Sequence, residues 1–238
     1  MSFKDNIDSK AIYNRKFVIE LRFKPIASII DKKGLIADTI AKANIFKPNN
    51  FWEISNNTVK FQDIEDKNNT QYIATVEYNR ISIQGTKIDS VDSFFNTFTK
   101  FYNIVKENIS EWTIRRIGCR ILGAYKAESD NYNAILSNFV KKFPSQYLID
   151  AYQVNNLSFK MEYASGMYQI SPLKRDDEFY TREFPSGLIN RNDGIMIDTD
   201  NYLLRVDDTD IDTIQNIKTI YIASLAVEKS LYDNLKKM

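Results

Sequence analysis

The feature that most constrains the fold of this 238-residue chain is a set of short runs in which apolar and polar residues alternate. In "KFVIELRF" (16–23) every second residue is apolar. Because successive side chains of a β-strand point to opposite faces, this spacing predicts a strand with one buried and one solvated face. The stretch "WTIRRIGCRILGAY" (112–125) has the same pattern and predicts a similar strand over 113–122.

Further runs predict an antiparallel sheet crossed by helices. Asn56-Asn57 and Asn79 separate neighbouring runs and indicate tight hairpins. The predicted strands cover 16–23, 51–55, 58–64, 72–78, 80–86, 113–122, 156–163, 167–171, 194–199 and 202–206. Helical spacing of apolar residues predicts helices over 34–43, 91–109, 132–142 and 209–237. Ser90 stands at the N-cap position of the second helix, and Thr209 with Asp212 resembles a capping box at the last.

The order of these elements is β-α-β4-α, written twice, which predicts an internal repeat. Arg15-Lys16-Phe17 in the first half matches Arg115-Arg116-Ile117 in the second. We expect a first repeat over 1–110 and a second over 111–238, with a long excursion inserted at 171–194. The predicted fold class is therefore α+β, with two helix-grip repeats that form one curved antiparallel sheet and carry helices on its convex face.

Two such units in tandem resemble the fold of the TATA-box-binding proteins, in which two repeats merge their sheets into a saddle. The resemblance lies in the element order and spans nearly the whole chain. The intercalating phenylalanines and the minor-groove contacts of that family cannot be placed in this sequence, so the resemblance does not imply minor-groove intercalation.

Two strand motifs, "FVIELRF" and "RRIGCRILGAY", are similar to those of a sporadically distributed family of uncharacterised bacterial proteins of similar length. Members carry an Arg-hydrophobic-Gly-x-Arg-Tyr strand at mid-chain. Arg116, Ile117, Gly118 and Arg120 match this pattern, whereas Ile121 stands where the aromatic residue is usual. The family implies no activity, cofactor or ligand.

Composition excludes several classes of function. The chain has no histidine, which removes the usual general base and every Ser-His or Cys-His nucleophile pair. Its one cysteine, Cys119, excludes an internal disulfide and lies in an apolar pattern typical of a buried residue. No apolar run reaches the ~18 residues of a membrane span. We expect a cytoplasmic protein with no membrane partner, no catalytic residues, no metal site and no cofactor; the oligomeric state is left open.

Alternation also predicts that basic residues gather on the solvated face of the sheet. Only two acidic residues, Glu20 and Glu162, are expected beside them. The basic residues predicted for this face are Lys16, Arg22, Lys24, Lys60, Arg80, Arg116, Arg120, Lys160 and Arg205. Gly118 lies among them, and a missing side chain within a sheet permits close approach of a ligand.

One interpretation is a non-catalytic surface that binds the phosphates of a nucleic acid. Another is an ordinary solvated sheet face, on which Lys and Arg are common. A third is a protein-interaction subunit of a bacterial defence or toxin-type system. Such a subunit would dock through a sheet edge or through the 171–194 excursion, where Phe179, Tyr180, Arg182 and Phe184 are the candidate partner-binding residues. These aromatic residues could equally fold down onto the sheet.

The acidic run at 198–213 resembles a metal loop only superficially. Asp208, Asp210 and Asp212 have alternate spacing, but Thr213 and Thr219 occupy the positions of the glycine and the glutamate that an EF-hand requires. We therefore interpret the run mainly as capping of the following helix. A carboxylate-metal nuclease is the weakest alternative, because the chain lacks the usual order of acids and lysine.

Overall fold

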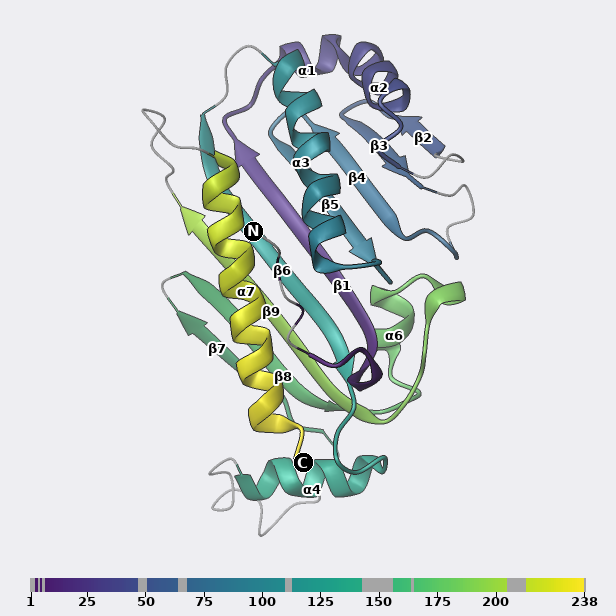
Figure 1. The fold of residues 1–238 in the computed structure, drawn as a ribbon, viewed down its shortest axis with the longest axis vertical. Coiled ribbons are helices and arrows are strands. Elements are labelled where there is room, and N and C mark those ends of the chain that lie inside the picture. The colour runs from purple at the N-terminus through teal and green to yellow at the C-terminus, as the bar shows by residue number, and fades with distance from the viewer. Residues whose placement is uncertain are drawn as a thin grey trace.

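The computed structural model describes residues 3, 5, 7–46, 51–63, 68–109, 113–142, 156–163, 165–204 and 213–237. In these residues the chain is α+β, as predicted, and its strands form one antiparallel sheet (Figure 1). The first half contains η1 (Ser9–Ala11), β1 (Ile12–Phe23), α1 (Ser28–Asp31), α2 (Lys33–Lys42), β2 (Phe51–Ile54), β3 (Thr58–Gln62), β4 (Tyr72–Glu77), β5 (Arg80–Thr86) and α3 (Val91–Asn108). The second half contains β6 (Ile114–Tyr125), α4 (Tyr132–Lys142), β7 (Phe159–Tyr163), β8 (Gly166–Leu173), α6 (Glu178–Glu183), η2 (Ser186–Leu188), β9 (Gly194–Leu204) and α7 (Thr213–Leu235).

The nine strands are ordered β2-β3-β4-β5-β1-β6-β9-β8-β7. The two long strands β1 and β6, predicted from the alternating runs, lie side by side at the centre and pair antiparallel along their length. The long helices α3 and α7 cross the same face of the sheet (Figure 1). No helix in the described part of the chain combines the length and hydropathy needed to cross a bilayer.

The prediction of two separate strands at 194–199 and 202–206 was wrong, because residues 194–204 form the single strand β9. Asp200 and Asn201 fall between the two predicted strands, yet the side chains of both have hydrogen-bond partners in the fold. Arg116 donates to the Asp200 carboxylate, and the Asn201 amide donates to Ser224 of α7. In the described residues three strands therefore follow α4, where four were expected; the tandem repeat stays a prediction.

Helix α3 begins where the sequence predicted it. The Ser90 hydroxyl accepts from the Ser93 backbone N–H, and Ser93 Oγ accepts from the Ser90 N–H, which completes a capping box. The apolar stripe of the helix is buried against the sheet. Ring contacts join Phe94 to Phe17 of β1 and to Tyr221 of α7, with centroids 5.4 and 6.1 Å apart. The two long helices therefore share one aromatic core over the central strands. The predicted capping box at Thr209 and Asp212 lies outside the described residues.

Cys119 is buried in this core, as predicted. Burial raises the pKa of its thiol to about 12, so the thiol is neutral at physiological pH and packs as a small apolar group.

A buried ionic cluster fastens α7 to the central strands. Arg15 of β1 donates to Glu228 of α7, and the Tyr125 hydroxyl of β6 donates to the same carboxylate. Arg15 also donates to Asp5, from Nη1 to Oδ2 at 2.6 Å. Glu228 is fully buried. Burial raises the pKa of this carboxyl above its usual value, and the ion pair with Arg15 opposes that rise.

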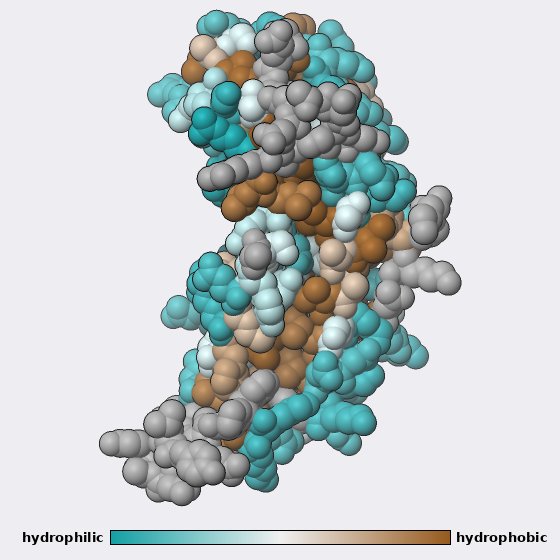
Figure 2. Space-filling model, turned by 90° about the vertical axis from the view of Figure 1, so that its left-hand side faces the viewer, coloured by the Kyte–Doolittle hydropathy of each residue, from teal (hydrophilic) through white to brown (hydrophobic). Residues whose placement is uncertain are grey.

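One side of the molecule carries an apolar stripe between two polar margins (Figure 2). This is the side on which β7 forms the edge of the sheet, in the left part of Figure 1. Tyr163 of the edge strand β7 is among the large apolar side chains that are exposed.

Arg15→Ala is expected to lower the free energy of unfolding by about 3–5 kcal/mol at pH 8, because it leaves Glu228 buried without a cation. The loss is expected to be smaller at pH 5. A carboxyl whose pKa is raised in the folded state binds more protons there than in the unfolded chain, so the stability of this variant falls as the pH rises. Urea unfolding at the two pH values measures both effects. Arg22→Ala, which removes an exposed arginine of the same strand, is the control and should cost about 1 kcal/mol or less. A pH-independent loss for Arg15→Ala would contradict the assignment to Glu228.

Candidate binding face of the sheet

We call the face of the sheet opposite α3 and α7 the open face. Residues that are paired across neighbouring strands share a face, and the register joins Arg22 to both Arg80 and Arg116. The same rule, applied from strand to strand, places seven of the predicted basic residues there: Lys16, Arg22, Lys60, Arg80, Arg116, Arg120 and Lys160. Lys24 lies just beyond the end of β1 and is exposed. Arg205 lies outside the described residues.

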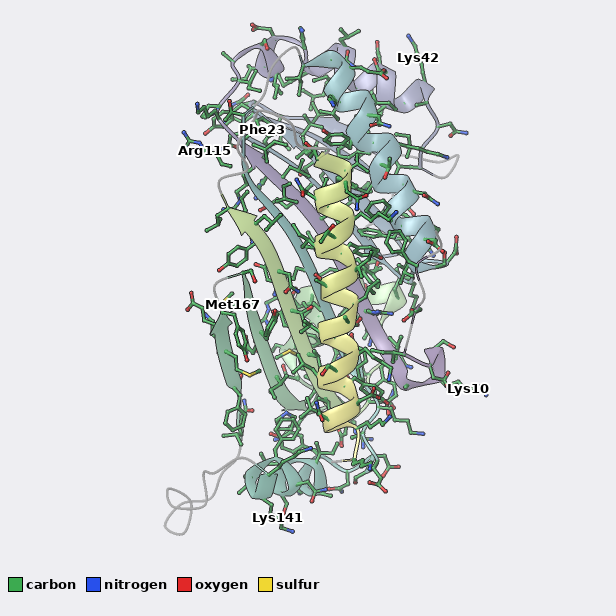
Figure 3. The ribbon with its side chains drawn as sticks, turned by 60° about the vertical axis from the view of Figure 1, so that its left-hand side comes forward. Lys10, Phe23, Lys42, Arg115, Lys141 and Met167 are labelled. Carbon is green, nitrogen blue, oxygen red and sulfur yellow. The ribbon has the colours of Figure 1, made fainter. Side chains whose placement is uncertain are left out.

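Arg115 does not belong to this set. The register between β1 and β6 shifts between Arg22 and Phe23, which pair with Arg116 and Ile114. Arg115 is therefore the extra residue of a bulge, and it is exposed at the end of the sheet near Phe23 (Figure 3).

Glu20 is the acceptor at the centre of the open face. Its Oε1 accepts from Arg22 Nε at 2.7 Å and from Arg116 Nη1 at 3.0 Å. Its Oε2 accepts from Arg80 Nη1 at 3.3 Å. Arg80 also donates to Glu77 of β4, and this hydrogen bond raises the pKa of the Arg80 guanidinium. Three arginines from three strands therefore converge on one carboxylate.

Two aspartates of β9 accept from the arginines of β6. Arg116 Nη2 lies 3.0 and 2.9 Å from the two Asp200 oxygens, and its guanidinium lies over the Tyr202 ring, 5.0 Å from the centroid. Arg120 binds Asp198 with two parallel hydrogen bonds of 2.8 and 2.7 Å. Burial raises the pKa of Asp200 even though Arg116 and Arg120 act to lower it, so the arginines only partly compensate for its desolvation.

The expected excess of basic residues over two acidic ones was wrong. Asp198 and Asp200 were missed because the acidic run at 198–213 was interpreted mainly as capping of the following helix, and Glu77 and Glu183 were not assigned to this face. Every cation of the five-residue group Lys16, Arg22, Arg80, Arg116 and Arg120 has a carboxylate partner. The carboxylates are also five: Glu20, Glu77, Glu183, Asp198 and Asp200. We call these ten residues the charged array. The ion pairs among the described residues do not include Lys24, Lys60 or Lys160.

Gly118 makes room for the Arg116 side chain of the charged array. A Cβ atom at this position would lie 2.7 Å from Arg116 Nη1, so the missing side chain lets the Arg116 guanidinium lie flat across the strand. The space that had been expected to admit a ligand backbone is filled by this arginine. A hollow of about 200 Å³ remains beside it, lined by Val18, Glu20, Arg22, Arg116, Gly118, Arg120 and Asp200.

The 171–194 excursion folds onto one end of the open face. Phe179, Tyr180 and Phe184 are buried, and they form an apolar cluster with Leu122 of β6 and Met196 of β9. Burial raises the pKa of Tyr180, whose hydroxyl donates to the Asn192 carbonyl. The three aromatic rings therefore pack inside the chain and do not form a surface for a partner.

Of the four predicted partner-binding residues, only Arg182 is exposed. Its neighbour Glu183 accepts from Lys16 Nζ at 2.7 Å and joins the excursion to β1. Burial alone would raise the pKa of Glu183, but the hydrogen bonds from Lys16 and Arg182 hold it below its usual value.

Within the described residues, no three His, Cys, Asp or Glu side chains are placed to hold a metal ion. Asp208, Asp210 and Asp212 lie outside them. Comparisons with protein-family models and with curated proteins find no match to this chain.

Phe179→Ala is expected to lower the free energy of unfolding by about 3–5 kcal/mol, because it empties a buried aromatic site. Urea unfolding measures the loss. Arg182→Ala, in the same short helix, is the control and should change stability by about 0.5 kcal/mol or less. Equal and small effects of the two substitutions would show that the excursion is not packed onto the sheet.

The double variant Asp198→Asn with Asp200→Asn is expected to bind heparin more tightly than the wild type, because it leaves Arg116 and Arg120 undercompensated on one face. Elution from a heparin column in a salt gradient measures this. Asp31→Asn with Asp38→Asn makes the same change in net charge at exposed positions of α1 and α2, and it is the control. If both double variants elute at the same salt concentration, the position of the aspartates has no influence.

Proposed function

We propose that this protein is a non-catalytic binding protein that docks another protein on the open face of its sheet. The observation that carries the proposal is the charged array, in which five cations and five carboxylates alternate across the central strands. This favours a protein partner over the nucleic acid that the sequence suggested.

A phosphate backbone would meet carboxylates at every central position of the array. Arg120 already gives its Nε and one N–H of Nη2 to Asp198, so a phosphate bound to its remaining N–H groups would lie beside that carboxylate. Glu20 poses the same obstacle for the three arginines that share it. Nucleic-acid affinity depends on unpaired cations, and those at the centre of this face are already neutralised.

A protein surface with both signs of charge fits the array better, since matched charges fix the register of two partners and exclude wrong ones. Arginine and tyrosine are enriched at the centres of protein interfaces. Arg116 stacked on Tyr202 supplies such a pair, and Leu204, 59% exposed, lies in register with Arg116 on the same face. The hollow beside Gly118 would receive one side chain of the partner.

Photo-crosslinking from the centre of the open face tests the proposal. A benzophenone amino acid placed at Val18, in the hollow, is expected to crosslink a protein in cells that naturally contain this chain. The same amino acid at Ala226, exposed on α7 away from the open face, is the matched control. A protein adduct that forms from Val18 and is lost with Arg116→Ala would support the proposal; equal adducts from Val18 and Ala226 would contradict it.

Fluorescence anisotropy with labelled single- and double-stranded DNA and RNA tests the alternative. We expect no binding that depends steeply on salt. An affinity that falls about a thousandfold between 50 and 200 mM salt, as six or more phosphate contacts produce, would replace a protein partner with a nucleic acid.

A further inference from the structure

We propose that β7 pairs antiparallel with β7 of a second copy of this chain, so that the two sheets join edge to edge in a symmetric dimer. This inference does not depend on the open face having a protein partner. It starts from the place of β7, which is the last strand in the sheet order and pairs in regular register with β8 on one side. In the described residues no strand pairs with its other side, where a row of backbone donors and acceptors faces outward.

The side chains of β7 divide between the two faces of the sheet. Lys160 and Glu162 are in register with Gln169 and Met167, which belong to the open face, and both are exposed. Met161 and Tyr163 belong to the helix-bearing face, where Tyr163 is 56% exposed. Met167 lies near the outer edge of the sheet, as Figure 3 shows. The strand is therefore charged on one face and apolar on the other.

The charges of β7 complement a second copy of the same strand. In an antiparallel pair centred on Met161, Lys160 of one copy lies opposite Glu162 of the other, and the symmetry repeats the pair. Directly opposite Cβ atoms in such a pair are about 5 Å apart, close enough for both ion pairs. On the other face, Met161 meets its own copy and Tyr163 meets Phe159.

The neighbouring registers are unfavourable. Opposite residues must lie on the same face, so the smallest shifts of the pairing move its centre to Lys160 or to Glu162. The first places two ammonium groups together, and the second places two carboxylates together. The opposite edge strand, β2, carries the single charge Glu53, so none of its registers gives an opposite-charge pair. Complementary charges thus single out one edge and one register.

Apolar surface next to β7 supports the same arrangement. Figure 2 shows an apolar stripe on the side of the molecule where β7 forms the edge of the sheet, and Tyr163 of β7 itself is exposed. A two-fold axis midway between the two Met161 residues, perpendicular to the sheet, keeps the helix-bearing faces of both copies on the same side. The dimer would therefore cover apolar surface as well as complete the hydrogen bonding of two edges.

Light scattering after size-exclusion chromatography, at increasing protein concentration, tests the dimer. We expect the wild type to approach twice its 27.7 kDa mass. Lys160→Glu and Glu162→Lys each create two like-charge pairs and are expected to weaken dimerisation about tenfold or more. An equimolar mixture of these two variants is expected to restore the dimer, because each then faces the opposite charge.

Glu53→Lys on β2 and Lys24→Glu beyond β1 make the same charge changes away from β7, and they should leave the dimer intact. Circular dichroism confirms that each variant is folded. A wild type that stays monomeric at all concentrations would overturn the proposal and leave this edge to a strand of another protein. Dimerisation that is unaffected by the β7 variants, or not restored by mixing them, would overturn it as well.

Discussion

The pairing of β1 with β6 is the constraint on which the rest of the structure depends. Its register sets Ile19 opposite Cys119 on the helix-bearing face and Glu20 opposite Gly118 on the open face. A slip of one residue would turn the apolar side chains outward and the charged ones into the core. Arg15 stabilises this register from the helix-bearing face, because its buried ion pair with Glu228 forms only when β1 and α7 are in their observed places.

Charged side chains are arranged differently on the two faces of the central strands. On the helix-bearing face the ion pair of Arg15 with Glu228 is sequestered from water, where a missing partner is costly. On the open face the charged side chains are partly exposed and form a network of ion pairs. Glu20 pairs with three arginines, and Arg116 pairs with two carboxylates. Such a network holds long side chains in fixed positions, and this order is useful to a surface that must match a partner.

Local pattern was sufficient to predict most of the elements. Alternation located β1 and β6, and the capping serine with its apolar stripe located α3. The extent of β9 could not be predicted from the local pattern, because it depends on tertiary contacts. The two predicted strands leave Asp200 and Asn201 between them, and only the contacts with Arg116 and Ser224 show how one strand accommodates both residues. The period-2 spacing of Asp198, Asp200 and Tyr202 was the one available signal that β9 continues through these residues.

The candidate site was predictable in position but not in character. The sequence placed Arg116, Arg120 and Gly118 on one face, yet the carboxylates that neutralise the arginines come from strands distant in the chain. The role of Gly118, which makes room for Arg116, depends on a side-chain conformation that no sequence pattern specifies. The sequence left open whether the aromatic residues of the excursion bind a partner or fold onto the sheet, and only packing decides between the two.

The pair of Arg15 and Glu228 also bears on how the chain reaches its native state. Its two members are 213 residues apart, and α7 follows every strand of the sheet in chain order. Arg15 is synthesised long before Glu228, so this ion pair can close only after α7 has been made. Contacts of such separation form slowly, because most of the chain must be ordered before they close. We therefore expect this ion pair to form late in folding, at the step in which α7 packs on the central strands and excludes water from the core between them.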